Sequence, residues 1–210
     1  MEKTQFLDLL EHSSKSTNSI TEIIRKRRSV YADEFFKKDI PDKLLIEILT
    51  NGSWAPTHKM TEPWRFVIFK NEYLDKLGLH LFEFYKKHYY SRFPKEIAKE
   101  KCDFLRTYPL KSACVVGIVL TKHKKANLPE WEEVAAVSAA VQNIALSCTA
   151  HNLGSYWSTP EGAINFIEKH EPLKDNEKSL GLLYIGYFDQ LNHKSTKKRT
   201  PIEKKITWFT

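Results

Sequence analysis

Apolar residues in the first third of the chain follow helical spacing and then strand spacing. Ser19-Ile20-Thr21-Glu22 has the form of a capping box, and the apolar residues that follow predict a helix that ends near Arg28. Pro41-Asp42 opens a second amphipathic helix. A polar loop over residues 54–65 then leads into a short strand over residues 66–69.

The middle of the chain predicts the longest helices and the central strand. The spacing over residues 72–101 predicts one or two helices, whose many aromatic residues indicate that they cover a pocket or a partner surface. Residues 112–120 are apolar on both faces, as expected of a central strand that is covered on each side. Pro129-Glu130 opens the longest helix, and Asn152-Leu153-Gly154 ends it.

Shorter elements complete the expected fold. Tyr156-Trp157 predicts a short strand or a turn, residues 163–169 a short helix, and residues 180–187 another buried strand. Strands that alternate with long helices indicate an α+β or α/β class, with helices on both faces of one sheet. No repeat or interdomain linker interrupts this pattern, so we expect a single domain over residues 1–210.

Positive charge gathers at two places in the sequence. The net charge is +7, yet residues 194–210 alone have a surplus of five positive charges, and Arg25-Lys26-Arg27-Arg28 forms a second cluster. Such concentration favours local anion sites over a continuous nucleic-acid footprint. The arm over residues 192–210 ends in aromatic residues, which predicts that it docks on its own core or on a second subunit.

The composition predicts a globular protein of a reducing compartment. With 41% hydrophobic and 28% charged residues, the chain can bury a substantial core. Cys102, Cys114 and Cys148 are odd in number and too far apart for a metal knuckle. Cys114 lies in an apolar run and Cys148 on an apolar stripe, so we expect these two to be buried thiols. The N-terminus lacks an apolar signal core, and the longest apolar run is too short to cross a bilayer. We therefore expect a cytoplasmic protein without a membrane partner.

The first basic cluster is a candidate anion site. Arg27-Arg28-Ser29 could bind a phosphate through guanidinium forks and a hydroxyl, although cations at a helix end also suit the helix dipole. Arg199 lies beside Thr200 in the second cluster, which could equally be a solvated charge run. Two groups that each pair cations with a hydroxyl are what a phosphomonoester requires.

Other candidates suit a flat ring. Trp157-Ser158-Thr159 presents an indole with two hydroxyls, although a core aromatic followed by a turn explains the same residues. His58 lies in a loop pinned by Pro56 and Pro63, where a lone histidine is otherwise a surface group. The sequence has no metal-binding histidine spacing, no dinucleotide-binding glycine turn and no P-loop. An isoalloxazine ring needs aromatic or aliphatic walls and few polar groups.

These segments stand in a familiar order, and from about residue 17 onward the chain resembles the nitroreductase family, most closely its small single-domain branch. No single motif is diagnostic, but their common register argues against coincidence. The motifs that carry the resemblance are Arg27-Arg28-Ser29, Ala55-Pro56-Thr57-His58-Lys59, Pro63-Trp64-Arg65-Phe66, Trp131-Glu132, the residues from Gly154 to Thr159, Leu183-Tyr184-Ile185-Gly186-Tyr187, and Lys197-Lys198-Arg199-Thr200-Pro201 before a Trp.

The resemblance implies an α+β fold with a three-layer arrangement of sheet and flanking helices, assembled as an intertwined homodimer that binds FMN at its interface. NAD(P)H would reduce the flavin, which would then pass electrons to a nitro compound, a quinone or a similar small-molecule acceptor. No metal and no catalytic side chain is implied. The residues assigned to FMN are Arg27, Arg28, Ser29 and Arg199 at the phosphate, and Trp54, His58, Glu62, Trp157, Ser158 and Thr159 along the ring and ribityl chain.

Three positions depart from the family pattern. Glu62 stands where the family commonly has Gln or Asn, and because an ionised carboxylate cannot donate, it could instead pair with Arg65 or Lys59. Trp54 and Ser158 stand where related sequences often carry Arg. Their neutral side chains remove two anion contacts and leave the phosphate to the remaining arginines.

Two other functions stay open at this point. A specialised flavoenzyme on the same scaffold, such as an oxidase, a dehalogenase or a flavin-consuming enzyme, would carry the same motifs. A basic module that binds nucleic acid or another polyanion would use the charge of +7 and the aromatic residues. Because the charge is concentrated in two places, we expect no nucleic-acid partner.

Overall fold

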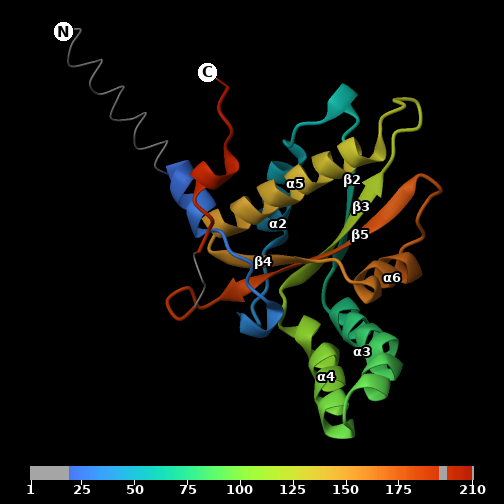
Figure 1. Cartoon of the computed structure of the whole chain (residues 1–210). Helices are drawn as coiled ribbons and strands as arrows, with labels where there is room; N and C mark the ends of the chain where they lie inside the picture. Colours follow the sequence, from blue (N-terminus) through green and yellow to red (C-terminus); the bar gives the residue numbers. More distant parts are fainter. Residues whose placement is uncertain (1–18, 194–197, 210) are drawn as a thin grey trace.

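The computed structural model describes residues 19–193 and 198–209, and its centre is a five-stranded antiparallel sheet (Figure 1). The strands are β1 (Phe35–Phe36), β2 (Trp64–Phe69), β3 (Cys114–Thr121), β4 (Leu153–Ser158) and β5 (Glu177–Phe188). β3 and β5 lie side by side in the middle, β2 pairs with the outer edge of β3, and β4 pairs with the outer edge of β5. β1 pairs with the last residues of β5, beyond the end of β3.

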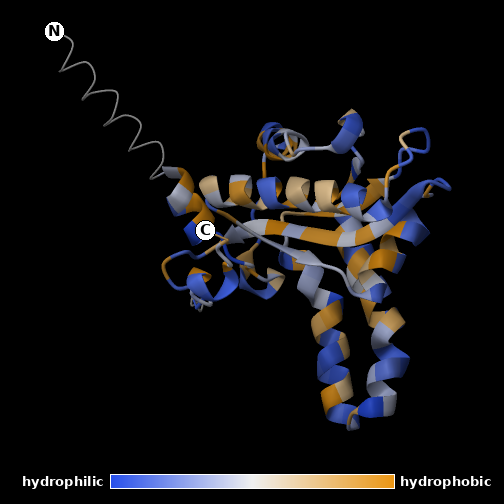
Figure 2. Cartoon of the chain, turned by 45° about the horizontal axis from the view of Figure 1, so that its top comes forward, coloured by the Kyte–Doolittle hydropathy of each residue, from blue (hydrophilic) through white to orange (hydrophobic). Residues whose placement is uncertain are grey.

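Helices cover both faces of this sheet. After a helix over residues 19–26, the helices are α2 (Asp42–Ser53), α3 (Glu72–Arg92), α4 (Lys95–Thr107), α5 (Glu130–Ala150) and α6 (Glu161–His170). α2 and α5 cover one face. α3 and α6 cover the other, and α3 forms with α4 a hairpin that projects from the body of the molecule (Figures 1 and 2). The predicted α+β class with three layers is confirmed.

Alternating side chains along β3 divide the hydrophobic core in two. Val115 and Val119 pack with Phe166 on the face that α3 and α6 cover, whereas Val116 and Ile118 pack on the face that α2 and α5 cover. Burying a side chain of this size contributes about 1.5–3 kcal/mol. Because the strand is covered on both sides, it appears in the sequence as one continuous apolar run, as predicted.

Several element boundaries differ from the sequence-based expectation. Residues 72–101 belong to two helices, one of the two expected alternatives, because Pro94 caps the start of α4 and cannot continue α3; α4 then runs beyond the expected end, to Thr107. Tyr156-Trp157 lies within β4, which begins directly after Asn152, a residue with a φ of 60° at the end of α5. β1 was not predicted, since two residues carry no periodic signal.

Cys114 and Cys148 are buried, as predicted, and Cys102 is buried as well. All three are free cysteines, and burial raises the pKa of the Cys114 thiol to about 12. These thiols are therefore protonated and poor nucleophiles. Within residues 19–193 and 198–209, no helix combines the length and the apolar character that a membrane span requires.

Arg65, from the Pro63-Trp64-Arg65-Phe66 motif, ties the end of the sheet together. Its guanidinium donates to both carboxylate oxygens of Glu177, at 2.8 and 3.0 Å, and to Glu171 at 2.7 Å. Burial opposes the charge of Glu177, whose side chain is 1% exposed, but Arg65 and the amide of Lys174 outweigh it and hold the pKa of this carboxyl below its usual value.

Replacing Arg65 by Met should therefore destabilise the fold. At neutral pH the free energy of unfolding should fall by about 3 kcal/mol, because Glu177 is left as an unpaired buried charge. The deficit should shrink as the pH falls, because the wild type loses the stabilisation of the ionised Glu177 when the pH passes below the lowered pKa of this carboxyl. Urea unfolding followed by tryptophan fluorescence measures both effects.

Lys76→Met is the matched control, because it breaks an exposed ion pair with Glu72 on α3. We expect it to leave the unfolding midpoint unchanged. Equal midpoints for the wild type and the Arg65 variant at neutral pH would refute this account of the network.

Candidate functional site

Cations from two distant parts of the sequence meet beside the first helix. Arg27 and Arg28 follow helix residues 19–26, and Arg199 from the C-terminal segment lines the same cavity of about 760 Å³. We call these three residues the arginine cluster. Burial, followed by the charges of Arg28 and Arg199, lowers the pKa of Arg27. In the part of the chain that the structure describes, neither Arg27 nor Arg199 forms an ion pair with a carboxylate, as expected of an anion site.

Arg28 has a different role from its neighbours. Its Nη1 donates to the carbonyl oxygens of Arg25 and Arg27, at 2.6 Å each, and so caps the carboxyl end of the first helix. The helix-dipole interpretation therefore applies to Arg28. Arg27 and Arg199 remain the stronger candidates for an anion. Arg27 makes no such bond in the described part of the chain, and Arg199 Nη1 donates to the carbonyl of the adjacent Lys198, at 3.0 Å, without capping a helix.

The segment after the arginine cluster lies along the outer edge of β4. Ser29 forms a parallel bridge with Ser155, and the Val30 amide donates to the Ser155 carbonyl at 3.2 Å. The Ser29 side chain is exposed, whereas Val30 is buried. Two residues beyond Ser29, about 7 Å along an extended backbone, Tyr31 enters the wall of a second cavity.

This second cavity, of about 360 Å³, has mainly aromatic walls, and we call it the tyrosine cavity. It lies on the sheet face that α3 and α4 approach. The rings of Tyr156 and Tyr184 stack with centroids 4.9 Å apart, and Tyr108 lies edge-on to Tyr156 and tilted against Tyr184. Its walls are formed by Tyr31, Asp33, Leu81, Tyr85, Phe104, Leu105, Tyr108, Tyr156, Ser158, Pro160, Ala163 and Tyr184.

Burial keeps the inner phenols of the tyrosine cavity uncharged. It is the main cause that raises the pKa of Tyr108, Tyr156 and Tyr184, and it raises that of Tyr156 to about 12. Asp33, an exposed residue, is also among the walls. An aromatic interior of uncharged phenols suits a flat, uncharged ring.

The structure separates Trp157 from Ser158. Side chains alternate along β4, so Ser158 lines the tyrosine cavity while Trp157 packs against the core under α2 and α5. The Trp157 indole N–H donates to the Leu180 carbonyl at 2.9 Å. Thr159 follows the end of β4 and is exposed. One ligand in the cavity could therefore meet the Ser158 side chain but not the Trp157 indole.

The loop that carries His58 has an unusual backbone. Lys59, Met60 and Glu62 all have positive φ angles, of 53°, 53° and 43°. His58 Nδ1 lies 2.7 Å from a Glu132 oxygen, and Lys59 Nζ donates to the Ala126 carbonyl at 2.9 Å. The loop is therefore held against the start of α5.

The expected pairing of Glu62 is wrong. Arg65 is bound to Glu171 and Glu177, and Lys59 reaches the Ala126 carbonyl instead. The positive φ of Glu62 accompanies an exposed side chain, and across the described segments no ion pair involves it.

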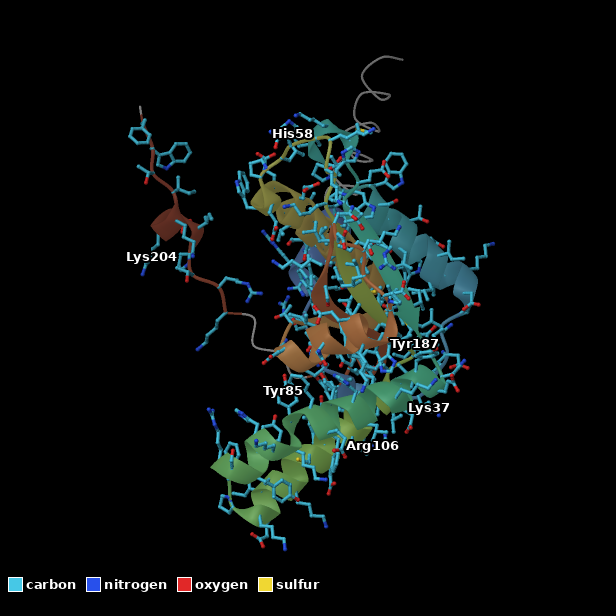
Figure 3. All side chains as sticks on the ribbon, turned by 90° about the vertical axis from the view of Figure 1, so that its right-hand side faces the viewer. Lys37, His58, Tyr85, Arg106, Tyr187 and Lys204 are labelled. Atoms are coloured by element: carbon cyan, nitrogen blue, oxygen red, sulfur yellow. The ribbon has the colours of Figure 1, made fainter. Side chains whose placement is uncertain are left out.

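The candidates from the sequence fall into two separate groups. His58 contacts Glu132 near the start of α5, whereas the first helix contacts the other end of α5, near Ala150. At 1.5 Å per residue these ends are about 27 Å apart. Figure 3 likewise places His58 far from Tyr85, which lines the tyrosine cavity. Trp54, at the end of α2, is 82% exposed.

Sequence reasoning did not assign the tyrosines of the cavity to the site, although it expected the aromatic residues of 72–101, among them Tyr85, to cover a pocket or a partner surface. Two of them could have been found by strand periodicity: Tyr31 lies two residues after Ser29, and Tyr156 two residues before Ser158. Tyr85 and Tyr108 come from α3 and its surroundings, and no local pattern connects them to β4. Among the described residues no group of His, Cys, Asp and Glu side chains could hold a metal ion.

The arginine cluster predicts that a phosphate anion stabilises the ligand-free protein. At ten times its Kd, phosphate should raise the melting temperature by about 3–6 °C. Arg27→Gln combined with Arg199→Gln should abolish this rise. Lys124→Gln combined with Lys125→Gln removes two exposed cations from a distant turn and should leave it intact. An equal rise in all three proteins, at matched ionic strength, would exclude a phosphate site at the arginine cluster.

Comparisons with known proteins agree with these features. YfhC of Bacillus subtilis strain 168, assigned by name to the NAD(P)H nitroreductases, is 28% identical over 193 residues, which cover 90% of this chain and 93% of YfhC. The iodotyrosine deiodinase of Hydra vulgaris is 25% identical over 95% of this chain and 76% of its own length. The structure of the FMN-dependent nitroreductase NfnB of Mycobacterium smegmatis in complex with NADPH has a TM-score of 0.73 at 15% identity, and the match covers 92% of this chain and 100% of NfnB.

A family model extends this similarity to most of the chain. The model described as Nitroreductase family matches residues 24–187, which include the first basic cluster, the His58 loop and the five strands up to Tyr187, the residue before the end of β5. Its match runs through every element that lines the tyrosine cavity. The chain therefore belongs to the nitroreductase family.

Proposed function

We propose that the chain is an FMN-dependent NAD(P)H oxidoreductase of the nitroreductase type, which passes hydride from NAD(P)H through the flavin to a nitro compound, a quinone or a similar acceptor. The observation that carries the proposal is that one short backbone segment contributes residues to both cavities. The segment from Arg27 to Tyr31 leads from the arginine cluster to the tyrosine cavity. FMN matches this arrangement, with an anionic phosphate and a flat ring joined by a short chain. Family membership and the names of YfhC and NfnB support it.

The described residues fit each part of FMN. Arg27 and Arg199 have no carboxylate partner in the described segments and would bind the phosphate, with the exposed Ser29 hydroxyl as a further donor. Tyr31 and Tyr156 would form walls for the ring. Ser158 would meet its polar edge. Arg28 would act mainly by fixing the end of the first helix, since its Nη1 is already bound to carbonyl oxygens.

Bound FMN would supply hydride acceptance and electron delivery. The residues of the protein would bind, orient and shield it. Tyr108, Tyr156 and Tyr184 would keep water and charge away from the ring, because burial holds these phenols protonated. Hydride transfer between stacked rings requires no side-chain acid or base, so we assign no catalytic residue.

A homodimer would complete the site. His58 lies about 27 Å along α5 from the first helix, too far to share one small ligand with Arg27 within a single chain. His58, Trp54 and Glu62 would therefore serve the cavities of the partner. The C-terminal arm supports such an exchange, because Trp208 is 78% and Phe209 is 95% exposed in the single chain. We propose one FMN-binding domain over residues 1–210 in a cytoplasmic homodimer.

A specialised flavoenzyme on the same scaffold is the second candidate. The similarity to the Hydra iodotyrosine deiodinase, which extends over 95% of this chain, favours a dehalogenase among these. Product analysis separates the two functions: release of halide from a halogenated tyrosine supports the dehalogenase, and reduction of a nitroaromatic compound or a quinone supports the first proposal.

The proposed function predicts a yellow protein after reconstitution with FMN. NADH or NADPH should bleach the visible flavin spectrum, and a nitroaromatic compound or a quinone should restore it. Arg27→Gln with Arg199→Gln should weaken FMN binding at least about 100-fold, because two charge-assisted hydrogen bonds are lost. The Lys124→Gln, Lys125→Gln variant should bind FMN normally. A wild-type chain that takes up no flavin at any concentration would overturn the proposal.

A site shared between two chains predicts complementation. Trp54→Ala with His58→Ala should weaken FMN binding through the partner's loop, and Arg27→Gln with Arg199→Gln should weaken it through the arginine cluster. A mixed dimer of the two variants should contain one intact site, so mixing after mild unfolding should restore part of the bound FMN. Flavin fluorescence and size exclusion measure the outcome. If the mixture binds no more FMN than the two variants do separately, the His58 loop and the arginine cluster do not contribute to one shared site.

A further inference from the structure

The first turn of α6 is attached to α3 at one glycine. The Gly162 amide donates to the Tyr85 hydroxyl at 3.0 Å, and His80 Nε2 lies 3.1 Å from the Gly162 carbonyl. Because a carbonyl oxygen only accepts, the proton of the His80 ring is on Nε2. Both polar backbone atoms of Gly162 are thus bound by side chains of α3.

Gly162 also determines how close Tyr85 can come. A Cβ at this position would lie 2.6 Å from the Tyr85 ring, closer than side chains can approach. The ring is fixed on its other sides by Phe84 and Tyr89, with centroids 5.0 and 5.8 Å away. Tyr85 is therefore held in one orientation beside the start of α6 (Figure 3).

The hydroxyl of Tyr85 has one hydrogen-bonding capacity left. A phenol can accept a hydrogen bond and donate one. Gly162 uses the accepting capacity, and no acceptor among residues 19–193 and 198–209 receives the Tyr85 O–H. Because Tyr85 lines the tyrosine cavity, this free donor is available to the occupant of the cavity.

We propose that Tyr85 donates a hydrogen bond to the flavin ring bound in the tyrosine cavity and thereby favours its reduction. The inference rests on the proposed function and adds a residue to it. Reduction increases the negative charge on the ring, and a fixed donor in a cavity that excludes water stabilises that charge more than it stabilises the oxidised ring. Tyr108 and Tyr184 belong to the buried core, whereas Tyr85 is only partly buried and its hydroxyl is fixed by a backbone amide.

Tyr85→Phe tests the proposal, because it removes only the hydroxyl. FMN content is measured first, and the midpoint potential of the bound flavin is then measured by equilibration with a reference dye. In the variant, the equilibrium constant for reduction of the bound flavin should be about tenfold lower. For a two-electron couple this lowers the midpoint potential by about 30 mV. An unchanged potential in an FMN-loaded variant would overturn the proposal.

Tyr89→Phe is the matched control. Tyr89 lies one turn along α3, stacks on Tyr85, and does not line the cavity. The midpoint potential of the flavin in the Tyr89→Phe variant should equal that in the wild type. A shift of the same size in both variants would show that the aromatic stack, and not the Tyr85 hydroxyl, sets the potential, and would also overturn the proposal.

The test remains decisive even when the Tyr85→Phe variant binds FMN weakly. By linkage, the change in potential equals the difference between the losses of affinity for reduced and for oxidised FMN. The proposal requires the loss for reduced FMN to be about tenfold larger, and equal losses would refute it. If the wild-type chain itself binds no FMN, the proposed function fails instead, so the two failures are distinguishable.

Discussion

The candidate site depends on a flat patch made by two facing glycines. Gly154 of β4 pairs with Gly186 of β5, and Phe35 packs directly onto both. A Cβ at either position would lie 2.8 Å or less from the Phe35 ring. This close approach seats the segment around Val30 against the edge of β4. Both the arginine cluster at one end of that segment and the tyrosine cavity at the other owe their positions to it.

The arginine cluster lies apart from the tyrosine cavity for an electrostatic reason. Burying an ionised group without a partner costs several kcal/mol. The cations are accordingly placed at the open end of the segment, where Arg199 is exposed, while the interior is lined by phenols that burial keeps neutral. A ligand that is charged at one end only is the kind of molecule that such a division accommodates.

Local patterns in the sequence predicted the parts of the fold that local forces determine. The start of α2, the start of α5 and the central strand β3 follow from proline positions and periodicity. The tyrosine cavity as a whole could not be predicted in this way, because only tertiary packing brings its walls together. They come from η1 (Ala32–Glu34), α3, α4, η3 (Tyr108–Lys111), β4, α6 and β5. The resemblance supplied Arg27, Ser29 and Arg199, but it could not reveal that Arg28 caps a helix or that Trp157 points away from Ser158.

The backbone of the His58 loop supports a role outside its own chain. A residue other than glycine in the left-handed region costs about 1–2 kcal/mol, and Lys59, Met60 and Glu62 all adopt positive φ. Such strain persists only where the surroundings enforce it. Here the contacts of His58 and Lys59 enforce it, yet Met60 remains 80% exposed, so the strain serves no packing within the chain. A shape maintained at that cost and directed outward is best explained if it meets a second subunit and the ligand held there.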